Sequence, residues 1–273
     1  MKKKIIFIDV DDTLNPSNGE VSEYTKSVMD RLKEKGILIV INTGRSAKYA
    51  IEKSLEAHLS NYIISSNGAE VYDYANRKII FEQSIDKKII KQVYKYCEES
   101  NLTLILNSLE NRYINIKDYK YNNEPVIYFD DINKVLNKNK INQLVILSKN
   151  YDRMLVIPNM FKEKFPMLKV VHSSIGLIEG KRVKGKEYYH DLVMDNTAKA
   201  TGIVELLDYL NLSTKDAIVV GNGYDDISMF DVVDTSIAVD NANDRLKEIA
   251  KYIALDVKED GAAKKLEELL LEE

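Results

Sequence analysis

The feature that most constrains this chain is a short apolar segment that ends abruptly in acidic residues. Residues 5–9 have the composition of a strand that is buried in a parallel sheet. Three carboxylates, Asp9, Asp11 and Asp12, stand at the end of this segment, and Thr13 follows them. Ligands of open α/β sheets bind at the carboxyl ends of the strands, so we expect the chemistry of the protein to lie here.

The spacing of Asp9 and Asp11 lets both side chains face the same side of the chain as it leaves the strand. Two neighbouring carboxylates repel each other unless a cation or a proton lies between them. Because Mg²⁺ prefers oxygen ligands and commonly bridges carboxylates to a phosphate, one interpretation is a Mg²⁺ site. The other interpretation is an Asp-rich turn that only ends the strand.

The segment IDVDDTL, residues 8–14, resembles the first motif of the haloacid dehalogenase superfamily of phosphohydrolases, Asp-x-Asp-x-Thr after a buried strand. The resemblance implies that Asp9 is the nucleophile that takes the phosphoryl group. It also implies that Asp11 is the general acid and base, and that Thr13 helps to fix the loop.

Composition narrows the class of protein. A chain of 273 residues with 45% hydrophobic and 30% charged residues is typical of a soluble globular protein of one large or two medium domains. The net charge of −4 argues against a general nucleic-acid binder, and the lack of a run of 18 apolar residues argues against a membrane span. Asp9 interrupts the apolar run behind the basic N-terminus, so we do not expect export. The single cysteine, Cys97, excludes an internal disulfide and fits a reducing cytoplasm.

A second polar loop is expected beside the first. Residues 22–36 predict a helix and residues 37–45 a second buried strand, which is how a parallel sheet begins. At the end of this strand Thr43 offers a hydroxyl, Gly44 lets the backbone approach an oxyanion, and Arg45 can pair with phosphate bidentately. These three residues match the second motif of the superfamily, in which the Thr binds the transferring phosphoryl group.

A third polar loop ends with Asn67. A helix over residues 46–57 and a strand within residues 61–68 precede it. Asn67 and Gly68 predict a turn before a hairpin of VYDY against KIIFE. The resemblance offers an alternative, in which Asn67 reaches the substrate.

Between residues 84 and 186 helices and strands alternate again, which predicts a second α/β unit inserted into the first. A helix over residues 151–164 is expected to be interrupted by Pro158, and the chain is expected to return to the first unit near Tyr188–Val193. An insertion at this place resembles the type IIB cap of the Cof-like branch, which would close over the site and choose the substrate. The predicted domains are therefore a core of residues 1–83 and 187–273 and a cap of residues 84–186.

Lys199 is expected in the first turn of a helix within residues 195–212. A lysine there opposes the helix dipole, which favours a specific anionic partner over a solvated charge. It matches the third motif, a Lys that neutralises the nucleophile and the phosphate. Two neighbours depart from the branch, because Ala198 replaces a small polar residue and Ala200 replaces a Gly.

The loop GNGYDD, residues 221–226, follows a buried strand and corresponds to the fourth motif, usually Gly-Asp-Gly-x-Asn-Asp. Asn222 stands where the Asp metal ligand is usual, and Asp225 stands where Asn is usual. An Asn carbonyl can bind Mg²⁺ but brings no charge. We therefore expect Asn222 to be a ligand while Asp225 or Asp226 supplies charge, directly or through water.

Together these features predict an α/β protein with a Rossmann-like parallel-sheet core and an inserted α/β cap. Its predicted activity is Mg²⁺-dependent hydrolysis of small phosphorylated metabolites through an aspartyl-phosphate, with a phosphomutase or a non-catalytic binding protein as the alternatives. The three histidines lack ligand spacing, which argues against a zinc site. The predicted residues are Asp9, Asp11, Thr43 and Lys199 for catalysis, Thr43, Gly44, Arg45, Asn67 and Lys199 for substrate binding, and Asp9, Asp11, Asn222, Asp225 and Asp226 for the metal.

Overall fold

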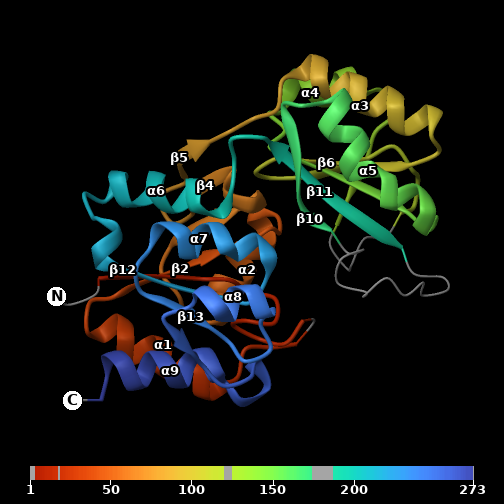
Figure 1. Cartoon of the computed structure of the whole chain (residues 1–273). Coiled ribbons are helices and arrows are strands. Elements are labelled where there is room, and N and C mark those ends of the chain that lie inside the picture. The colour runs from red at the N-terminus through yellow and green to blue at the C-terminus, as the bar shows by residue number, and fades with distance from the viewer. Residues whose placement is uncertain (1–3, 18, 120–124, 174–186, 273) are drawn as a thin grey trace. The chain divides into compact units, whose positions relative to one another are not determined.

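A computed structural model describes residues 4–17, 19–119, 125–173 and 187–272 (Figure 1). The chain divides into two compact units, one formed by Met1–Phe81 with Ala198–Glu273 and the other by Glu82–Thr197. Each unit combines a sheet with helices, which confirms the predicted α/β fold class. Over the described residues, no helix has both the length and the apolar character needed to cross a membrane.

The first unit is built on a mostly parallel sheet. In its described residues the strand order is β14-β13-β12-β1-β2-β3-β4-β5, with parallel pairing from β14 to β3 and antiparallel pairing between β3 and β4. The wholly buried, apolar β1 lies between β2 and β12, as a central parallel strand should. The strands are β1 (Ile5–Ile8), β2 (Leu38–Asn42), β3 (Tyr62–Ser65), β4 (Glu70–Asp73), β5 (Lys78–Glu82), β12 (Ala217–Gly221), β13 (Ser236–Ala238) and β14 (Tyr252–Ile253).

Helices cover both faces of this sheet. Figure 1 shows α1 and α9 side by side along one face, and α6 and α7 along the other. Ser22 and Ser46 cap α1 and α2 by accepting hydrogen bonds from main-chain N–H groups three residues later, which fixes where these helices begin. The helices are α1 (Glu23–Glu34), α2 (Ala47–Glu56), α6 (Lys199–Tyr209), α7 (Ile227–Val232), α8 (Asp244–Ile249) and α9 (Gly261–Leu270).

A close backbone approach ties the loop after β3 to the start of α6. Ser66, Asn67 and Gly68 have left-handed φ angles of 50°, 58° and 92°. A Cβ atom at Gly68 would lie 2.0 Å from the carbonyl oxygen of Ala198, so only glycine fits there. The loop that carries Asn67 is thereby fixed against the residue that precedes Lys199, and the predicted β4 and β5 follow it as neighbours in the sheet.

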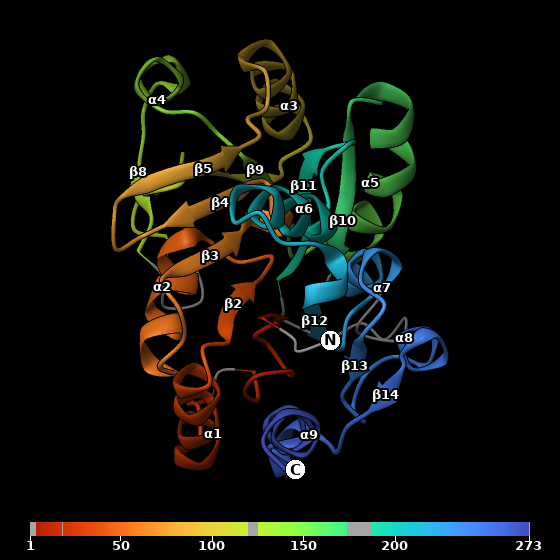
Figure 2. The same ribbon diagram turned by 90° about the vertical axis from the view of Figure 1, so that its left-hand side faces the viewer.

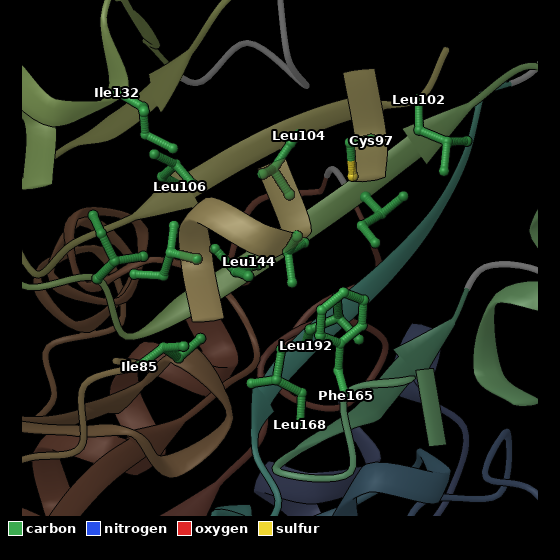
Figure 3. Packing of buried hydrophobic residues seen from close by; sticks show 14 of the residues in the cluster. Ile85, Cys97, Leu102, Leu104, Leu106, Ile132, Leu144, Phe165, Leu168 and Leu192 are labelled. Atoms are coloured by element: carbon green, nitrogen blue, oxygen red, sulfur yellow. The ribbon is translucent and has the colours of Figure 1, made fainter. Parts of the chain in front are cut away.

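The second unit contains a largely antiparallel sheet with helices on one face. Its described strands have the order β10-β11-β9-β6-β7-β8, and the pair β7–β8 is parallel. Helices α3, α4 and α5 pack on the face that carries Leu104, Leu144 and Leu192, and together they form an apolar core (Figures 2 and 3). The elements are β6 (Thr103–Asn107), β7 (Arg112–Ile114), β8 (Ile127–Tyr128), β9 (Gln143–Ser148), β10 (Leu168–Ser173), β11 (Tyr188–Met194), α3 (Lys87–Glu99), α4 (Ile132–Lys138) and α5 (Tyr151–Lys164).

The prediction that the chain returns to the first unit near Tyr188–Val193 is wrong. Strand β11 pairs with β9 and β10 in the second sheet, where Leu192 lies opposite both Leu144 and Val170. The apolar composition of this segment correctly indicates a buried strand, but composition does not specify the sheet that buries it. The first unit resumes at Ala198 instead of residue 187.

Helix α5 continues through Pro158, where the sequence predicted an interruption. Proline has no N–H group to donate to the carbonyl oxygen of Met154, four residues earlier in the helix. The buried His190 on β11 supplies the missing donor, because its Nε2 lies 2.8 Å from that oxygen. The imidazole therefore compensates for the proline, and this contact joins the helix to the sheet.

This compensation can be tested with a double-mutant cycle. We expect His190→Phe to lower the free energy of unfolding by about 1–3 kcal/mol, since it leaves the Met154 carbonyl buried without a donor. In a Pro158→Ala background the helix regains its own N–H donor, so the same change should cost at least about 1 kcal/mol less. Urea denaturation of the four proteins measures this difference, and strictly additive losses would show that the two residues act independently.

Candidate active site

The predicted site residues come from four adjacent strands and one helix. Asp9 follows β1, Thr43 follows β2, Asn67 follows β3 and Asn222 follows β12, while Lys199 is the first residue of α6. Because β12, β1, β2 and β3 are consecutive in the sheet and parallel, their carboxyl ends lie at the same edge. The fold thus gathers the four sequence motifs at one place.

The buried ammonium group of Lys199 lies at the centre of this site. Nζ of Lys199 lies 2.7 Å from Oδ1 of Asp9, 2.6 Å from Oδ1 of Asp226 and 2.9 Å from Oδ2 of Asp225. The Lys199 side chain is 1% exposed, so these ion pairs lie away from solvent. The anionic partner expected from its position in the first turn of a helix is therefore a set of three carboxylates.

The charges in this cluster do not balance. Burial lowers the pKa of Lys199, but the attraction of Asp225, Asp226 and Asp9 outweighs it and holds the pKa well above its usual value. Burial raises the pKa of Asp9, Lys199 lowers it, and Asp226 and Asp225 raise it further, so that it ends well above its usual range. Three carboxylates around one ammonium group thus favour the uptake of a proton or of a further cation.

Asp226 holds the fourth loop together. Its Oδ1 accepts from Lys199, and its Oδ2 accepts hydrogen bonds of 2.8 Å from the N–H groups of Asn222 and Gly223. A Cβ atom at Gly221 would lie 2.7 Å from the carboxyl group of Asp226, so glycine is needed where the strand ends. With both oxygens engaged by the protein, Asp226 is a structural anchor of the loop and an orienting partner of Lys199.

Asp11 has a different partner from Asp9. Its carboxylate pairs with the guanidinium group of Arg45, at 2.9 Å from Nε and 3.0 Å from Nη2. Its main-chain oxygen accepts a long hydrogen bond of 3.3 Å from Nδ2 of Asn222. The two acidic residues of the first motif are therefore held by two different cations, Lys199 and Arg45.

The remaining predicted residues shape the loops. Thr13 is buried, with its hydroxyl 3.4 Å from Oδ2 of Asp9. The hydroxyl of Thr43 accepts from the N–H of Arg45 at 3.2 Å, and the carbonyl of Thr43 accepts from the N–H of Asn67 at 3.1 Å. The Asn67 side chain packs on Gly44, where a Cβ atom would lie 2.9 Å from its Oδ1. The turn at Asn67 that leads into β4 is present, and substrate contact by its side chain stays a prediction.

Three residues with clear contacts in the site were not assigned a role from the sequence. Asn42 donates to the carbonyl of Lys199 at 3.0 Å, Asn243 donates to the carbonyl of Asn222, and Tyr49 lies beside Arg45. Asn42 is a polar residue at the end of an apolar strand, and this pattern in the sequence could have indicated a site residue. Tyr49 stands in the first turn of α2, but Arg45 lies before the helix, so helical spacing does not link the two residues.

The donor set fits a hard divalent cation. Among the described residues, no group of three His, Cys, Asp or Glu side chains is arranged to hold a metal ion on its own. The candidate donors near Asp9 are the Asp225 carboxylate, the Asn222 amide and the main-chain oxygen of Asp11. The candidate ligand atoms are oxygens, and the site carries excess negative charge. Both properties suit Mg²⁺ better than a softer metal.

Comparison with known proteins places these residues in a family. The family described as haloacid dehalogenase-like hydrolase matches residues 6–266. A protein of Buchnera aphidicola, provisionally named a phosphatase, is 28% identical over 89% of this chain and 88% of its own length. A Bacillus subtilis protein with the same provisional naming, YkrA, is 24% identical over 98% of both chains.

Solved structures have the same fold over nearly the whole chain. A haloacid dehalogenase-like hydrolase of Bacteroides thetaiotaomicron superposes with a TM-score of 0.83 at 21% identity, covering 98% of this chain and 100% of its own. A sugar phosphatase of subclass IIB of the superfamily has a TM-score of 0.78 at 20% identity, covering 97% and 98%. At these identities the likeness concerns the fold.

The raised pKa of Asp9 predicts how stability depends on pH without metal. Because the folded-state pKa exceeds the unfolded value of about 3.9, ionisation of Asp9 destabilises the folded state progressively as pH rises toward that raised pKa. Asn carries no charge, so the Tm of Asp9→Asn should rise relative to wild type as pH increases from about 5 to about 8. Thermal denaturation in EDTA measures the two curves.

Asp12→Asn is the matched control, because it makes the same change in a carboxylate that accepts hydrogen bonds from the N–H and the hydroxyl of Ser17. We expect its Tm curve to run parallel to that of the wild-type protein. A Tm difference between Asp9→Asn and wild type that stays constant or shrinks with rising pH would contradict the assignment.

Proposed function

Because the chain belongs to the haloacid dehalogenase-like hydrolases, we propose that it is a Mg²⁺-dependent phosphatase that hydrolyses small phosphorylated metabolites, such as sugar phosphates, through a phosphorylated Asp9. The observation that carries the proposal is the buried pair of Asp9 and Lys199 at the carboxyl edge of the sheet, 2.7 Å apart. A carboxylate fixed by a cation in a closed place can act as a nucleophile on phosphorus. The provisional naming of the relatives as phosphatases supports the same reaction.

In the first step an oxygen of Asp9 forms a bond to phosphorus while the bond to the leaving oxygen breaks. Oδ1 of Asp9 is held by Lys199. Within the described part of the chain the one hydrogen bond of Oδ2 is a long contact of 3.4 Å to Thr13, so Oδ2 is the better placed nucleophile. Asp11, protonated in the substrate complex, gives its proton to the leaving oxygen as the general acid and becomes the carboxylate that Arg45 holds. The product of this step is an aspartyl-phosphate and a free alcohol.

In the second step water attacks the phosphorus of the aspartyl-phosphate. Asp11 takes the proton of the water, the bond between phosphorus and the Asp9 oxygen breaks, and inorganic phosphate leaves. Lys199 stays close to the Asp9 oxygens throughout and offsets negative charge on the transferring group. Thr43 and the N–H groups of its loop are proposed to bind the phosphoryl oxygens.

Mg²⁺ is proposed to be held by Asp9, by the main-chain oxygen of Asp11 and by Asn222, with Asp225 supplying further charge. When bound, the ion neutralises charge on the phosphoryl group and on the clustered carboxylates. Asp226 is better assigned to the loop, because Lys199 and two main-chain N–H groups occupy its oxygens. The carboxylate of Asp11 is paired with Arg45, so the main-chain carbonyl oxygen of Asp11 is the better placed metal ligand.

Substrate choice is proposed to lie in the second unit. The sequence predicted a cap over residues 84–186, and a subclass IIB sugar phosphatase has the same fold over 97% of this chain. Sugar phosphates are therefore the first substrates to examine. A reducing cytoplasm, which the single Cys97 favours, is where such metabolites would be met.

The chemistry is tested by phosphate release from a panel of phosphorylated metabolites, with Mg²⁺ and with EDTA. Asp9→Asn should lower kcat at least about a thousandfold, because it removes the nucleophile. Asp12→Asn, the neighbouring change of the same kind, should stay within about threefold of wild type, since Asp12 pairs with Ser17 outside the cluster. A loss of only severalfold in Asp9→Asn would exclude it as the nucleophile, and an isomeric phosphate in place of free phosphate would identify a mutase.

The exchanged residues of the fourth motif give a separate test of the metal site. Asn222→Asp adds a charge to the donor set, so we expect Mg²⁺ to bind about tenfold more tightly, because affinity rises with the charge of the ligands. Isothermal titration calorimetry measures this without any substrate. Asp240→Asn is the control, as that side chain pairs with Lys247 at the surface. An unchanged Kd in Asn222→Asp would remove Asn222 from the proposed ligands.

A further inference from the structure

A second ion pair of the active site joins Asp11 to Arg45, which lies two residues before α2. Arg45 presents two nitrogen atoms to the two carboxylate oxygens of Asp11, with Nε 2.9 Å from Oδ2 and Nη2 3.0 Å from Oδ1. The two side chains are 26% and 25% exposed. A bidentate pair fixes the orientation of a carboxylate as well as its position, because two parallel hydrogen bonds define its plane.

Tyr49 supports this pair from the first turn of α2. The guanidinium carbon of Arg45 lies 5.0 Å from the centre of the Tyr49 ring, within the range of a cation–π interaction. The Tyr49 hydroxyl lies 3.4 Å from Oδ1 of Asp11, which is a long contact for a hydrogen bond.

The backbone around both residues is held by neighbouring loops. Ser46 caps α2 by accepting from the N–H of Tyr49. The N–H of Arg45 donates to the Thr43 hydroxyl at 3.2 Å, and its carbonyl accepts from the N–H of Ser66 at 2.9 Å. These hydrogen bonds therefore fix the backbone from which the side chains of Arg45 and Tyr49 contact Asp11.

We propose that Arg45 and Tyr49 are positioning residues that orient the carboxylate of Asp11 for proton transfer. This role rests on the proposed function, in which Asp11 protonates the leaving oxygen and later deprotonates water. Small errors in the orientation of such a group cost rate, because proton transfer needs hydrogen-bond geometry. It differs from the role that the sequence predicted for Arg45, which was bidentate pairing with the phosphate of the substrate.

The two roles predict different dependence on the leaving group. An arginine that binds the phosphoryl group acts on every phosphate ester alike, because all of them carry the same phosphoryl group. An arginine that orients Asp11 acts most strongly on esters whose leaving oxygen needs a proton. A sugar alkoxide needs one, whereas p-nitrophenolate is a stable anion and leaves without it.

The test compares Arg45→Lys with wild type on two substrates, p-nitrophenyl phosphate and the sugar phosphate that the wild-type protein hydrolyses best. Lysine keeps the positive charge and loses the planar fork. We expect kcat/KM, which reports the first step and therefore the departure of the leaving group, to fall at least about tenfold more for the sugar phosphate than for p-nitrophenyl phosphate. Tyr49→Phe should change the ratio of the two kcat/KM values in the same direction by a smaller factor. This variant replaces Arg45→Lys in the comparison if Arg45→Lys does not fold.

Tyr74→Phe is the matched control. It removes a phenol hydroxyl that lies 3.3 Å from Ser54 of the same helix α2, away from Asp11, so the ratio of the two kcat/KM values should stay as in wild type. Equal losses of kcat/KM on both esters would assign Arg45 to the phosphoryl group and overturn the proposal. A wild-type protein that hydrolyses neither ester would instead overturn the proposed function, and this role with it.

Discussion

The active site depends on one buried ammonium group that holds carboxylates from two distant parts of the sequence. Lys199 bonds Asp9 after β1 and Asp225 and Asp226 after β12, in a place that is closed to solvent. Removing several charges from water is costly and is tolerated only where partners of opposite charge replace the lost hydration. The pairing of β1 with β12 brings these partners together, and the first residue of α6 then delivers the lysine.

The structure divides the charged residues of the site into two groups with different tasks. Lys199 and Asp226 hold Asp9 and the fourth loop, whereas Arg45, with Tyr49 beside it, holds Asp11. This separation matters for the proposed reaction, in which Asp9 attacks phosphorus while Asp11 transfers a proton. If both carboxylates were paired with one cation, a change in the charge of the first would shift the pKa of the second.

Much of this arrangement was accessible from the sequence, because the signals were local. Buried strands that end in polar loops predicted the parallel sheet and its reactive edge, and the resemblance to the haloacid dehalogenase superfamily is confirmed by the family match over residues 6–266. The failures concern partners that are distant in sequence. The sequence prediction assigned β11 to the wrong sheet. It also expected the helix to be interrupted at Pro158, because no residue close to Pro158 in the sequence indicates the hydrogen bond from His190. The anchoring role of Asp226 likewise depends on loop geometry that composition does not encode.

The position of the second unit within the chain has a consequence for how the protein is made. Strands β1 to β5 leave the ribosome first, but β12, the neighbour of β1, follows only after Glu82–Thr197 has been synthesised. Until then one edge of β1 has no partner, and the Asp9 carboxylate has no Lys199. Pairings so distant in sequence form late and leave apolar strand edges exposed in the meantime. Protection of the nascent first unit from aggregation therefore matters most while residues 82–221 are being synthesised.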